Sequence, residues 1–290
     1  MYSILQVRGS RGGESGRWRR YSWPVFFILT ILWAAQAKAE TPVDLELALA
    51  IDVSRSIDAD EAQLQREGYI KAFRNPEVIN AITTGMLGRI AVGYFEWAGF
   101  RHADIVVDWT VIDGAASANA FADALADGNP ISASRTSISV AIDFARPWFD
   151  NNGFEGVRRV VDVSGDGPNN WGDLVTNARD RAVAAGVTIN GLPILDQGMG
   201  LFSRFNIGSL DLYYRDCVIG GTGAFLVVAA DFNDFARAVR RKLVLEIAGI
   251  QPPSFARRSA GPIVVQAEKP ARLSPPCDIG ETMWRDRDGF

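Results

Sequence analysis

Five oxygen-bearing side chains, at three places in the chain, have the types and the order expected of a cation site. Asp52, Ser54 and Ser56 follow one apolar run, Thr136 precedes a predicted helix, and Asp166 follows a second apolar run. Carboxylate and hydroxyl oxygens are hard ligands, which suit Mg²⁺, Mn²⁺ or Ca²⁺. Aspartates also cap turns and serines cap helices, so each residue alone has an ordinary structural explanation. The ordered combination favours a divalent-cation site.

The overall composition excludes several other kinds of site. The 290 residues include one histidine, His102, and two cysteines, so sites built from several imidazoles and zinc-ribbon arrays are excluded. The formal net charge is −4, which argues against a dedicated nucleic-acid binder, and we expect no nucleic-acid partner. Hydrophobic residues make up 48% and charged residues 22% of the chain, as in folded globular proteins.

The first 39 residues have the pattern of a secretory signal peptide. Several arginines precede an apolar run over residues 23–35, and Ala37-Lys38-Ala39 gives an A-x-A cleavage pattern before Glu40. The run is interrupted by Pro24 and is shorter than the ~18–20 residues that a membrane span needs. We therefore expect export to the periplasm or the extracellular space, with no stable membrane span after cleavage.

The periodicity of the remaining chain predicts strands that alternate with helices. Strands are expected at residues 45–51, 89–97, 104–112, 157–163, 187–194 and 225–230. Helices are expected at residues 58–73, 77–82, 117–126, 137–149, 173–185 and 231–247, with a short one at 210–215. Continuous apolar strands between helices predict an α/β fold with a doubly wound, mostly parallel sheet and helices on both faces. A short link at residues 99–103 predicts one antiparallel edge strand.

Two local signals refine these helices. Asp58 and Glu61 form a D-x-x-E pair, which predicts a capping box and a helix that starts near Ala59. Pro147 is expected to end or kink the helix over residues 137–149 near its last turn. Because Asp58 already supplies the first cap, the serines before it are not needed for capping, which strengthens the prediction of a cation site.

The composition changes after residue 250. Six of the 13 prolines lie between residues 252 and 276, and no helical period is present there. We expect residues 40–250 to form one domain and residues 251–290 to form a Pro-rich extended C-terminal tail. Cys217 and Cys277 are an even pair in an oxidising compartment, and are candidates for a disulfide that ties the tail to the domain. The sequence leaves their pairing open, because it does not give their separation in space.

Two further carboxylates lie in apolar segments. Glu96 falls near the end of a predicted strand, and either reaches the cation site or pairs with an arginine. Asp162 lies inside an apolar strand, where an unpaired carboxylate would be costly. We expect Asp162 to be hydrogen-bonded in a structural role.

The candidate ligands fall in loops at the carboxyl ends of strands, which is where doubly wound sheets bind their ligands. The chain has an Asp-x-Ser-x-Ser run at residues 52–56, followed later by Thr136 and then by Asp166. In this order of residues it resembles the von Willebrand factor A family, which includes integrin inserted domains. Four stretches are similar to an exported bacterial branch of that family: residues 50–54, 95–97, 162–170 and 218–221. The resemblance covers roughly residues 43–248.

The resemblance implies a metal-ion-dependent adhesion site, or MIDAS. Its ligands would be Asp52, Ser54, Ser56, Thr136 and Asp166. Neutral hydroxyl ligands leave most of the charge of the cation uncompensated, so an open coordination position attracts an Asp or Glu carboxylate of a partner protein. The implied function is that of a non-catalytic protein-binding module, with Mg²⁺ as the expected cation and Mn²⁺ and Ca²⁺ as alternatives.

Two arginines depart from the family pattern. Arg55 lies between the two serines, where the family usually has glycine, and Arg135 lies directly before Thr136, in a stretch where the family often has glycine. These arginines either crowd the loop and repel the cation, clamp an acidic partner, or point to solvent. The candidate partner-binding rim consists of Arg55, Arg135, Asn169, Asn170 and Trp171. For Trp171, packing in the core is the alternative.

Two other functions stay open. In the first, which Arg55 and Arg135 suggest, a protein of the same fold has a degraded metal site and binds its partner without metal. The second is a metal-dependent phosphohydrolase with Asp52 as nucleophile, which would want a second carboxylate close by and a lysine near the phosphate. Position 54 is serine and the three loops contain no lysine, so we expect no enzyme activity.

Overall fold

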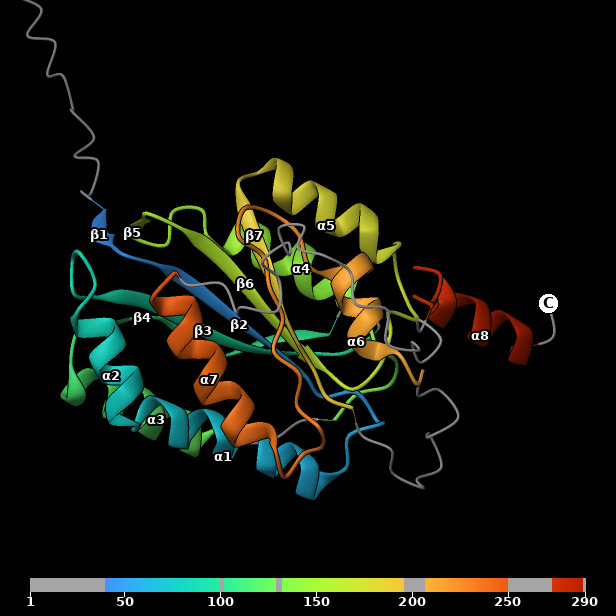
Figure 1. Cartoon of the computed structure of the whole chain (residues 1–290), viewed down its shortest axis with the longest axis horizontal. Coiled ribbons are helices and arrows are strands. Elements are labelled where there is room, and N and C mark those ends of the chain that lie inside the picture. Colours follow the sequence, from blue (N-terminus) through green and yellow to red (C-terminus); the bar gives the residue numbers. More distant parts are fainter. Residues whose placement is uncertain (1–39, 100–101, 129–131, 196–206, 250–272, 289–290) are drawn as a thin grey trace, which may run out of the picture. The chain divides into compact units, whose positions relative to one another are not determined.

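The computed structural model describes residues 40–99, 102–128, 132–195, 207–249 and 273–288 (Figure 1). The expected signal peptide, residues 1–39, lies outside these ranges, as does most of the proline-rich segment after residue 250. A search of the described ranges finds no helix with the length and apolar character of a membrane span.

A five-stranded sheet forms the centre of the domain. Its strands are β2 (Glu46–Asp52), β3 (Ile90–Trp97), β4 (Ala103–Ile112), β6 (Arg159–Gly165) and β7 (Val187–Pro193). They lie in the order β4-β3-β2-β6-β7, and every neighbouring pair is parallel except β3 and β4. The expected α/β fold with one antiparallel edge strand is therefore confirmed.

Helices cover both faces of this sheet (Figure 1). One face packs against α1 (Ala59–Phe73), α2 (Pro76–Thr83), α3 (Ala115–Asp127) and α7 (Phe235–Ile247). The other face packs against α4 (Ile138–Trp148), α5 (Val175–Ala184) and α6 (Leu210–Tyr213), which continues as a π-helical turn, Tyr214–Val218. Strand β2 serves both cores, because its alternate side chains point to opposite faces: Leu49 to the first and Ala50 to the second.

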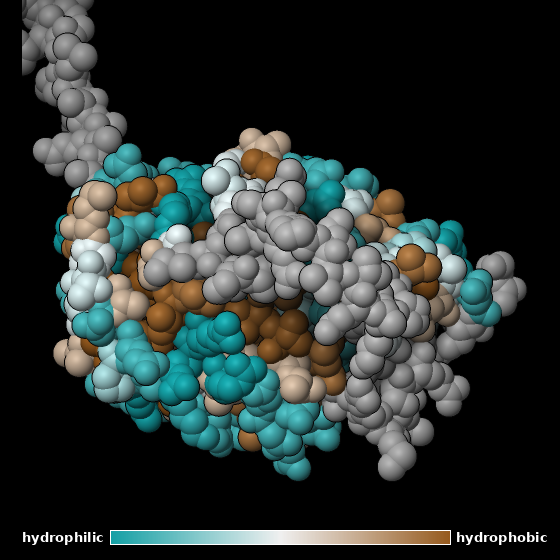
Figure 2. All heavy atoms as spheres, viewed as in Figure 1, coloured by the Kyte–Doolittle hydropathy of each residue, from teal (hydrophilic) through white to brown (hydrophobic). Residues whose placement is uncertain are grey.

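Helix α7 is amphipathic, as expected for a helix that covers one face of the sheet. Phe235, Val239 and Leu243 are buried in the first core. Arg237 and Arg240 are exposed, and Figure 2 shows a hydrophilic patch over this helix. The burial of the apolar stripe attaches α7 to α1 and α2.

The local signals for the first helix and for Pro147 are matched by the structure. The Asp58 carboxylate accepts a 2.9 Å hydrogen bond from the Glu61 amide, and the Glu61 carboxylate accepts one of 2.9 Å from the Asp58 amide. This reciprocal pair is the expected capping box. Pro147 is the penultimate residue of α4, so that helix ends where the proline predicted.

A second, smaller sheet was not expected. Strand β1 (Thr41–Val43) pairs in parallel with β5 (Phe154–Gly156). The buried Glu46 carboxylate supports this pair, because it accepts hydrogen bonds from the Gly156 amide at 2.7 Å and from Asn152 at 2.6 Å. Three-residue strands are too short to leave an apolar alternation in the sequence.

The expected strand at residues 225–230 is wrong as a continuous strand. This segment forms only isolated parallel bridges, which join Leu226 to Gly191 of β7 and Ala229 to Ile194, the residue after β7. The Asn190 side chain accepts a 2.9 Å hydrogen bond from the Phe225 amide. A side chain thus takes the place of a backbone partner where the strand would begin.

The C-terminal segment is not extended throughout. Residues Ile279–Asp288 form helix α8. The prolines of the tail end at position 276, and the following residues contain no proline. A helix can therefore form in the last part of the tail, and the prediction of an extended tail is wrong there.

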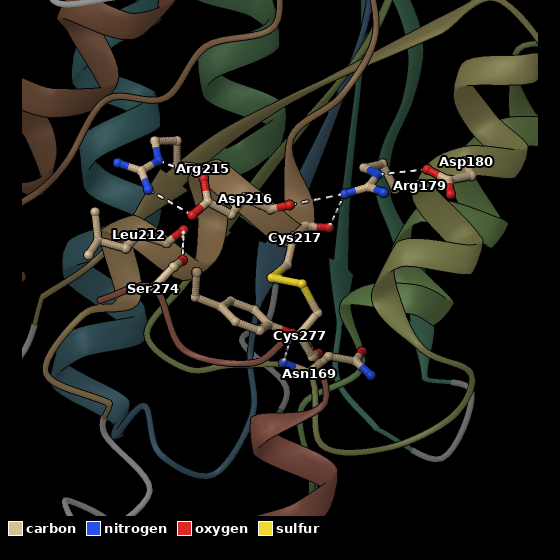
Figure 3. The surroundings of a disulfide bond; sticks show 10 residues. Asn169, Arg179, Asp180, Leu212, Arg215, Asp216, Cys217, Ser274 and Cys277 are labelled. Atoms are coloured by element: carbon tan, nitrogen blue, oxygen red, sulfur yellow. Dashed lines mark hydrogen bonds and ion pairs between the residues drawn. A yellow bond between two sulfur atoms is a disulfide. The ribbon is translucent and has the colours of Figure 1, made fainter. Parts of the chain in front are cut away.

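A disulfide ties this segment to the domain (Figure 3). It joins Cys217 of the π-helical turn to Cys277, with a Cα–Cα distance of 5.4 Å. Close by, the Ser274 hydroxyl donates a 3.3 Å hydrogen bond to the Leu212 carbonyl, as drawn in Figure 3. The chain is thus fixed to the end of α6 directly before α8 begins.

Glu96 and Asp162, the two carboxylates noted in apolar segments of the sequence, are each paired with a basic side chain. Glu96 forms an ion pair with Arg66 of α1, with both side chains almost completely buried. Asp162 lies 2.6 Å from Lys242 of α7, which also lies 3.1 Å from Glu246. Burial raises the pKa of Asp162 to about 7, although the charge of Lys242 acts in the opposite direction. Glu96 therefore takes the arginine-pairing alternative, and Asp162 has a structural role.

Candidate metal site

The topology of the sheet brings the candidate loops together. Asp52 is the last residue of β2, and Asp166 directly follows β6. These strands are adjacent and parallel, so their carboxyl ends meet at one edge. An isolated bridge between Ser54 and Ala133 draws in the loop that carries Thr136.

Hydrogen bonds connect the five predicted ligands into one group. The Thr136 hydroxyl donates to the Ser54 hydroxyl at 3.3 Å, and the hydroxyls of Ser54 and Ser56 lie 2.9 Å apart. The Ser56 hydroxyl donates to Asp166 at 2.8 Å. The Asp52 carboxylate accepts a 2.8 Å bond from the Ser54 amide. The structure thus places all five side chains at one site.

This group has a buried floor and an open side. Asp52, Ser54 and Thr136 are at most 5% exposed, whereas Ser56 is exposed and Asp166 is half-buried. Burial raises the pKa of the Asp52 carboxyl well above its usual range, and the nearby Asp166 carboxylate raises it further. A cation bound between the two carboxylates would reverse both effects, because it stabilises their charged forms.

The donor set fits a hard divalent cation. Oδ2 of Asp52 is buried and has no hydrogen-bond partner among the described residues, and such an oxygen is costly unless something binds it. The described ranges contain no group of three or more His, Cys, Asp or Glu residues that could hold a metal. The candidate ligands are therefore two carboxylates and three hydroxyls, a set suited to Mg²⁺ rather than to soft metals.

Three residues that the sequence did not single out border Asp52. The Gln65 side chain of α1 donates a 3.3 Å hydrogen bond to the Asp52 carbonyl. A Cβ atom on Gly165 would lie 2.9 Å from both Asp52 Oδ2 and the Tyr214 hydroxyl. Burial raises the pKa of Tyr214 well above its usual range, and the charge of Asp52 adds to this rise. Tyr214 lies in the π-helical turn, so no local pattern around Asp52 could have pointed to it.

The two arginines that depart from the family pattern have different surroundings. Arg55 is exposed. Arg135 has a φ of +73°, in the left-handed region that glycine favours and other residues rarely adopt. Its guanidinium carbon lies 3.6 Å from the ring centroid of Trp284 in α8 and 5.2 Å from that of Trp171.

The other candidate rim residues have distinct positions. Asn169 is fully buried, accepts a 3.0 Å hydrogen bond from the Ser139 amide and donates one of 2.6 Å to Glu281. It therefore offers a partner no surface, and the expectation that Asn169 belongs to the rim is wrong. Asn170 binds both backbone groups of Thr136. Its side-chain oxygen accepts a 3.0 Å hydrogen bond from the Thr136 backbone amide, and its backbone amide donates one of 2.9 Å to the Thr136 carbonyl. Trp171 is 38% exposed.

A cavity of about 1020 Å³ lies beside the site. Its walls come from the Thr136 loop, the loop after β6, α4 and α8, and include Arg135, Phe144, Asn170, Trp171, Glu281 and Trp284. Asn170 and Arg135 both adjoin Thr136, so the cavity lies next to that residue, although none of the five candidate ligands lines it. It combines aromatic walls with polar groups, as binding pockets do.

Comparison with known proteins supports the fold. The family model described as "Protein of unknown function (DUF1194)" matches residues 42–251. No curated protein sequence matches the chain. Similar solved structures are found, and the fold is of the von Willebrand factor A type, as the resemblance implied.

Three of these structures illustrate the similarity. Proximal thread matrix protein 1 from the mussel byssus has a TM-score of 0.50 and 16% identity, over 72% of this chain and 49% of that one. The pilus adhesin SpaC from Lactobacillus rhamnosus GG has a TM-score of 0.51 and 13% identity, over 72% and 31%. A von Willebrand factor type A protein from Catenulispora acidiphila has a TM-score of 0.47 and 12% identity, over 71% and 43%. The chain thus spans half or less of each of these proteins.

Proposed function

Because the chain belongs to the DUF1194 family and has a von Willebrand factor A fold, we propose that it is a binding module that depends on a divalent cation. Asp52, Ser54, Ser56, Thr136 and Asp166 would hold the cation, with Mg²⁺ as the expected species. The cation would supply an electrophilic centre for an Asp or Glu carboxylate of a partner protein. This function requires no turnover.

The buried, unpartnered Oδ2 of Asp52 is the observation that carries the proposal. It lies at the floor of a group whose other oxygens are already held together by hydrogen bonds. A cation would satisfy this oxygen and offset the mutual repulsion of Asp52 and Asp166. The open side at Ser56 leaves room for a carboxylate from outside.

The surroundings support a protein as the partner. The cavity beside the site offers two tryptophans, Trp171 and Trp284, next to Arg135, and aromatic and arginine side chains are enriched in protein interfaces. Two of the similar structures are an adhesin and a thread-matrix protein. We also propose that the protein acts outside the cytoplasm, which its signal-peptide pattern and its disulfide support.

Calorimetric titration with Mg²⁺, Mn²⁺ and Ca²⁺ tests the metal site. The informative variant is Asp52→Asn, which keeps the shape of the side chain and removes its charge. The matched control is Asp127→Asn, an exposed residue at the end of α3. We expect binding in the wild type and the control, and its loss in Asp52→Asn with the circular dichroism spectrum unchanged. Equal affinities in all three proteins would rule out this site.

Two other outcomes correspond to the alternatives. A wild type that binds none of the three cations indicates the degraded site, in which the partner binds without metal. Hydrolysis of a generic phosphate ester that requires a cation, and that Asp52→Asn abolishes, indicates the phosphohydrolase instead.

A further inference from the structure

Arg135 holds a backbone conformation that its side chain disfavours. Its φ of +73° brings Cβ into steric conflict with its own backbone, which glycine avoids. The surrounding chain demands this conformation: the Arg135 carbonyl accepts a 2.7 Å hydrogen bond from the Gly99 amide. A Cβ atom on Gly99 would lie 2.2 Å from Cβ of Arg135, so the two backbones cross at close range.

This conformation determines where Thr136 lies. Thr136 is the next residue, and Asn170 bonds both its amide and its carbonyl. If Arg135 relaxed to a negative φ, the peptide plane between residues 135 and 136 would rotate. The Thr136 hydroxyl would then leave the Ser54 hydroxyl, to which it donates a hydrogen bond. The strain at Arg135 is thus coupled to the candidate metal site.

Trp284 holds the Arg135 side chain in place. The guanidinium carbon lies 3.6 Å from the centroid of its ring, which is well within the range of a cation–π interaction. Trp284 is fixed in turn, because Glu281 of the same helix accepts a 2.6 Å hydrogen bond from the buried Asn169 side chain. The disulfide to Cys277 anchors the chain directly before α8.

We propose that Trp284 is a positioning residue for the candidate metal site. By holding the guanidinium of Arg135, it stabilises the left-handed backbone that presents Thr136, and it places the positive charge against an aromatic ring. Trp284 lies beyond residue 251, where the family match ends, so the site depends on a segment outside the family domain. This inference rests on the proposed function, since it takes Thr136 to be a ligand of the cation.

A double-mutant cycle on the full chain tests the inference, with Mg²⁺ affinity as the measurement. Trp284→Ala is expected to weaken binding on the order of tenfold, the upper part of the range for a cation–π contact. Trp284→Phe keeps an aromatic face and should restore most of the affinity. Arg135→Gly should raise the affinity, because it removes a positive charge and adopts the left-handed conformation without strain.

The coupling between positions 135 and 284 shows whether Trp284 acts through Arg135. In the Arg135→Gly background, Trp284→Ala should change Mg²⁺ affinity by less than about twofold, since glycine needs no support. A loss as large as in the wild-type background would overturn the inference, because Trp284 would then act without Arg135. A general loss of stability in Trp284→Ala would lower the affinity in both backgrounds alike, so the cycle distinguishes it.

A second measurement separates this inference from the proposed function. If the wild type binds no cation, the metal site fails, and the exchange rate of the Thr136 amide hydrogen is followed instead. This amide donates to Asn170, so its protection reports the position of Thr136. Trp284→Ala should speed its exchange in the wild-type background but not in the Arg135→Gly background. Equal exchange in all four proteins would overturn the positioning role, whatever the outcome for the metal.

Discussion

The Ser56 hydroxyl donates a 2.8 Å hydrogen bond to Oδ1 of Asp166, which lies 110 positions further along the chain. The bond joins the loop after β2 directly to the loop after β6. It lies on the exposed side of the candidate site, whereas Asp52 and Ser54 form the buried floor. An outer ligand can therefore be removed without disturbing the residues beneath it.

Replacement of Ser56 by alanine should separate metal binding from stability. We expect Ser56→Ala to weaken Mg²⁺ binding severalfold, because one hydroxyl ligand is lost. The free energy of unfolding should fall by no more than about 1 kcal/mol, since an exposed hydrogen bond contributes little. Calorimetry and urea unfolding give the two values. The control Ser132→Ala removes another exposed hydroxyl outside the group. If Ser56→Ala and Ser132→Ala bound Mg²⁺ with the same affinity, Ser56 would be excluded as a ligand.

A methyl group at position 165 should damage the floor of the site. The Cβ atom of Gly165→Ala would lie 2.9 Å from Asp52 Oδ2 and from the Tyr214 hydroxyl, so one of these buried groups must move. We expect a stability loss of about 1–3 kcal/mol, as for other overpacked cores, together with the loss of Mg²⁺ binding.

The control for this prediction is Gly208→Ala. Its added Cβ atom would meet no atom within 4 Å, so both the unfolding midpoint and the affinity should stay close to those of the wild type. If Gly165→Ala bound Mg²⁺ as the control does, the carboxylate of Asp52 would not be a ligand in its present position.

The buried Asp162 should make stability depend on pH. Burial raises its pKa to about 7, compared with about 3.9 for an unfolded chain. Between these values the folded protein binds a proton at Asp162 that the unfolded chain has lost, so the free energy of unfolding falls as the pH rises from about 4 to about 7. The remainder of this contribution is lost as the pH rises through the pKa of the folded state.

Urea unfolding at several pH values checks this slope. In Asp162→Asn the amide replaces the protonated carboxyl, so the part of the slope that Asp162 contributes should vanish. Other titrating groups act in both proteins and cancel in the difference between them. A difference between wild type and variant that stays constant from pH 4 to pH 7 would contradict the raised pKa of Asp162.

The disulfide should stabilise the attachment of α8 more than the sheet. Cys217 and Cys277 enclose a long loop, with a sequence separation of 60, so the variant with both replaced by serine should lose about 2–4 kcal/mol of stability. Hydrogen exchange should quicken first in α8 and the turn Tyr214–Val218, while β2 and β6 keep their protection. Reduction of the wild type should reproduce this pattern. Uniform loss of protection across the sheet would instead mean that the bond supports the whole domain.

The sequence could predict the elements that carry the ligands, because those elements obey local rules. The apolar run that ends at Asp52 is typical of a buried strand, and the pair of Asp58 and Glu61 starts the next helix through its own side chains. Because β2 ends at Asp52 and Asp166 directly follows β6, two adjacent parallel strands place both aspartates at one edge. The fold class and the grouping of the five side chains follow from these local facts.

The parts that could not be predicted depend on distant residues. Trp284 contacts Arg135 from a segment that a disulfide ties to the domain, and the sequence does not show which cysteines are close. Asn169 reads as a loop residue, yet contacts from α4 and α8 bury it. Residues 225–230 have an apolar run typical of a strand, but they form only isolated bridges, and the Asn190 side chain takes the Phe225 amide at the start of the segment.

The position of α8 also has an evolutionary consequence. The helix packs beside the loops of the candidate site, but it contributes no strand to the sheet and no residue to the family domain. Mutations in this short appendage can therefore reshape the wall that faces an incoming partner without endangering the folding of the core. Under the proposed function, substitutions in α8 alone would change the surface offered to a partner, while the five candidate cation ligands stay the same.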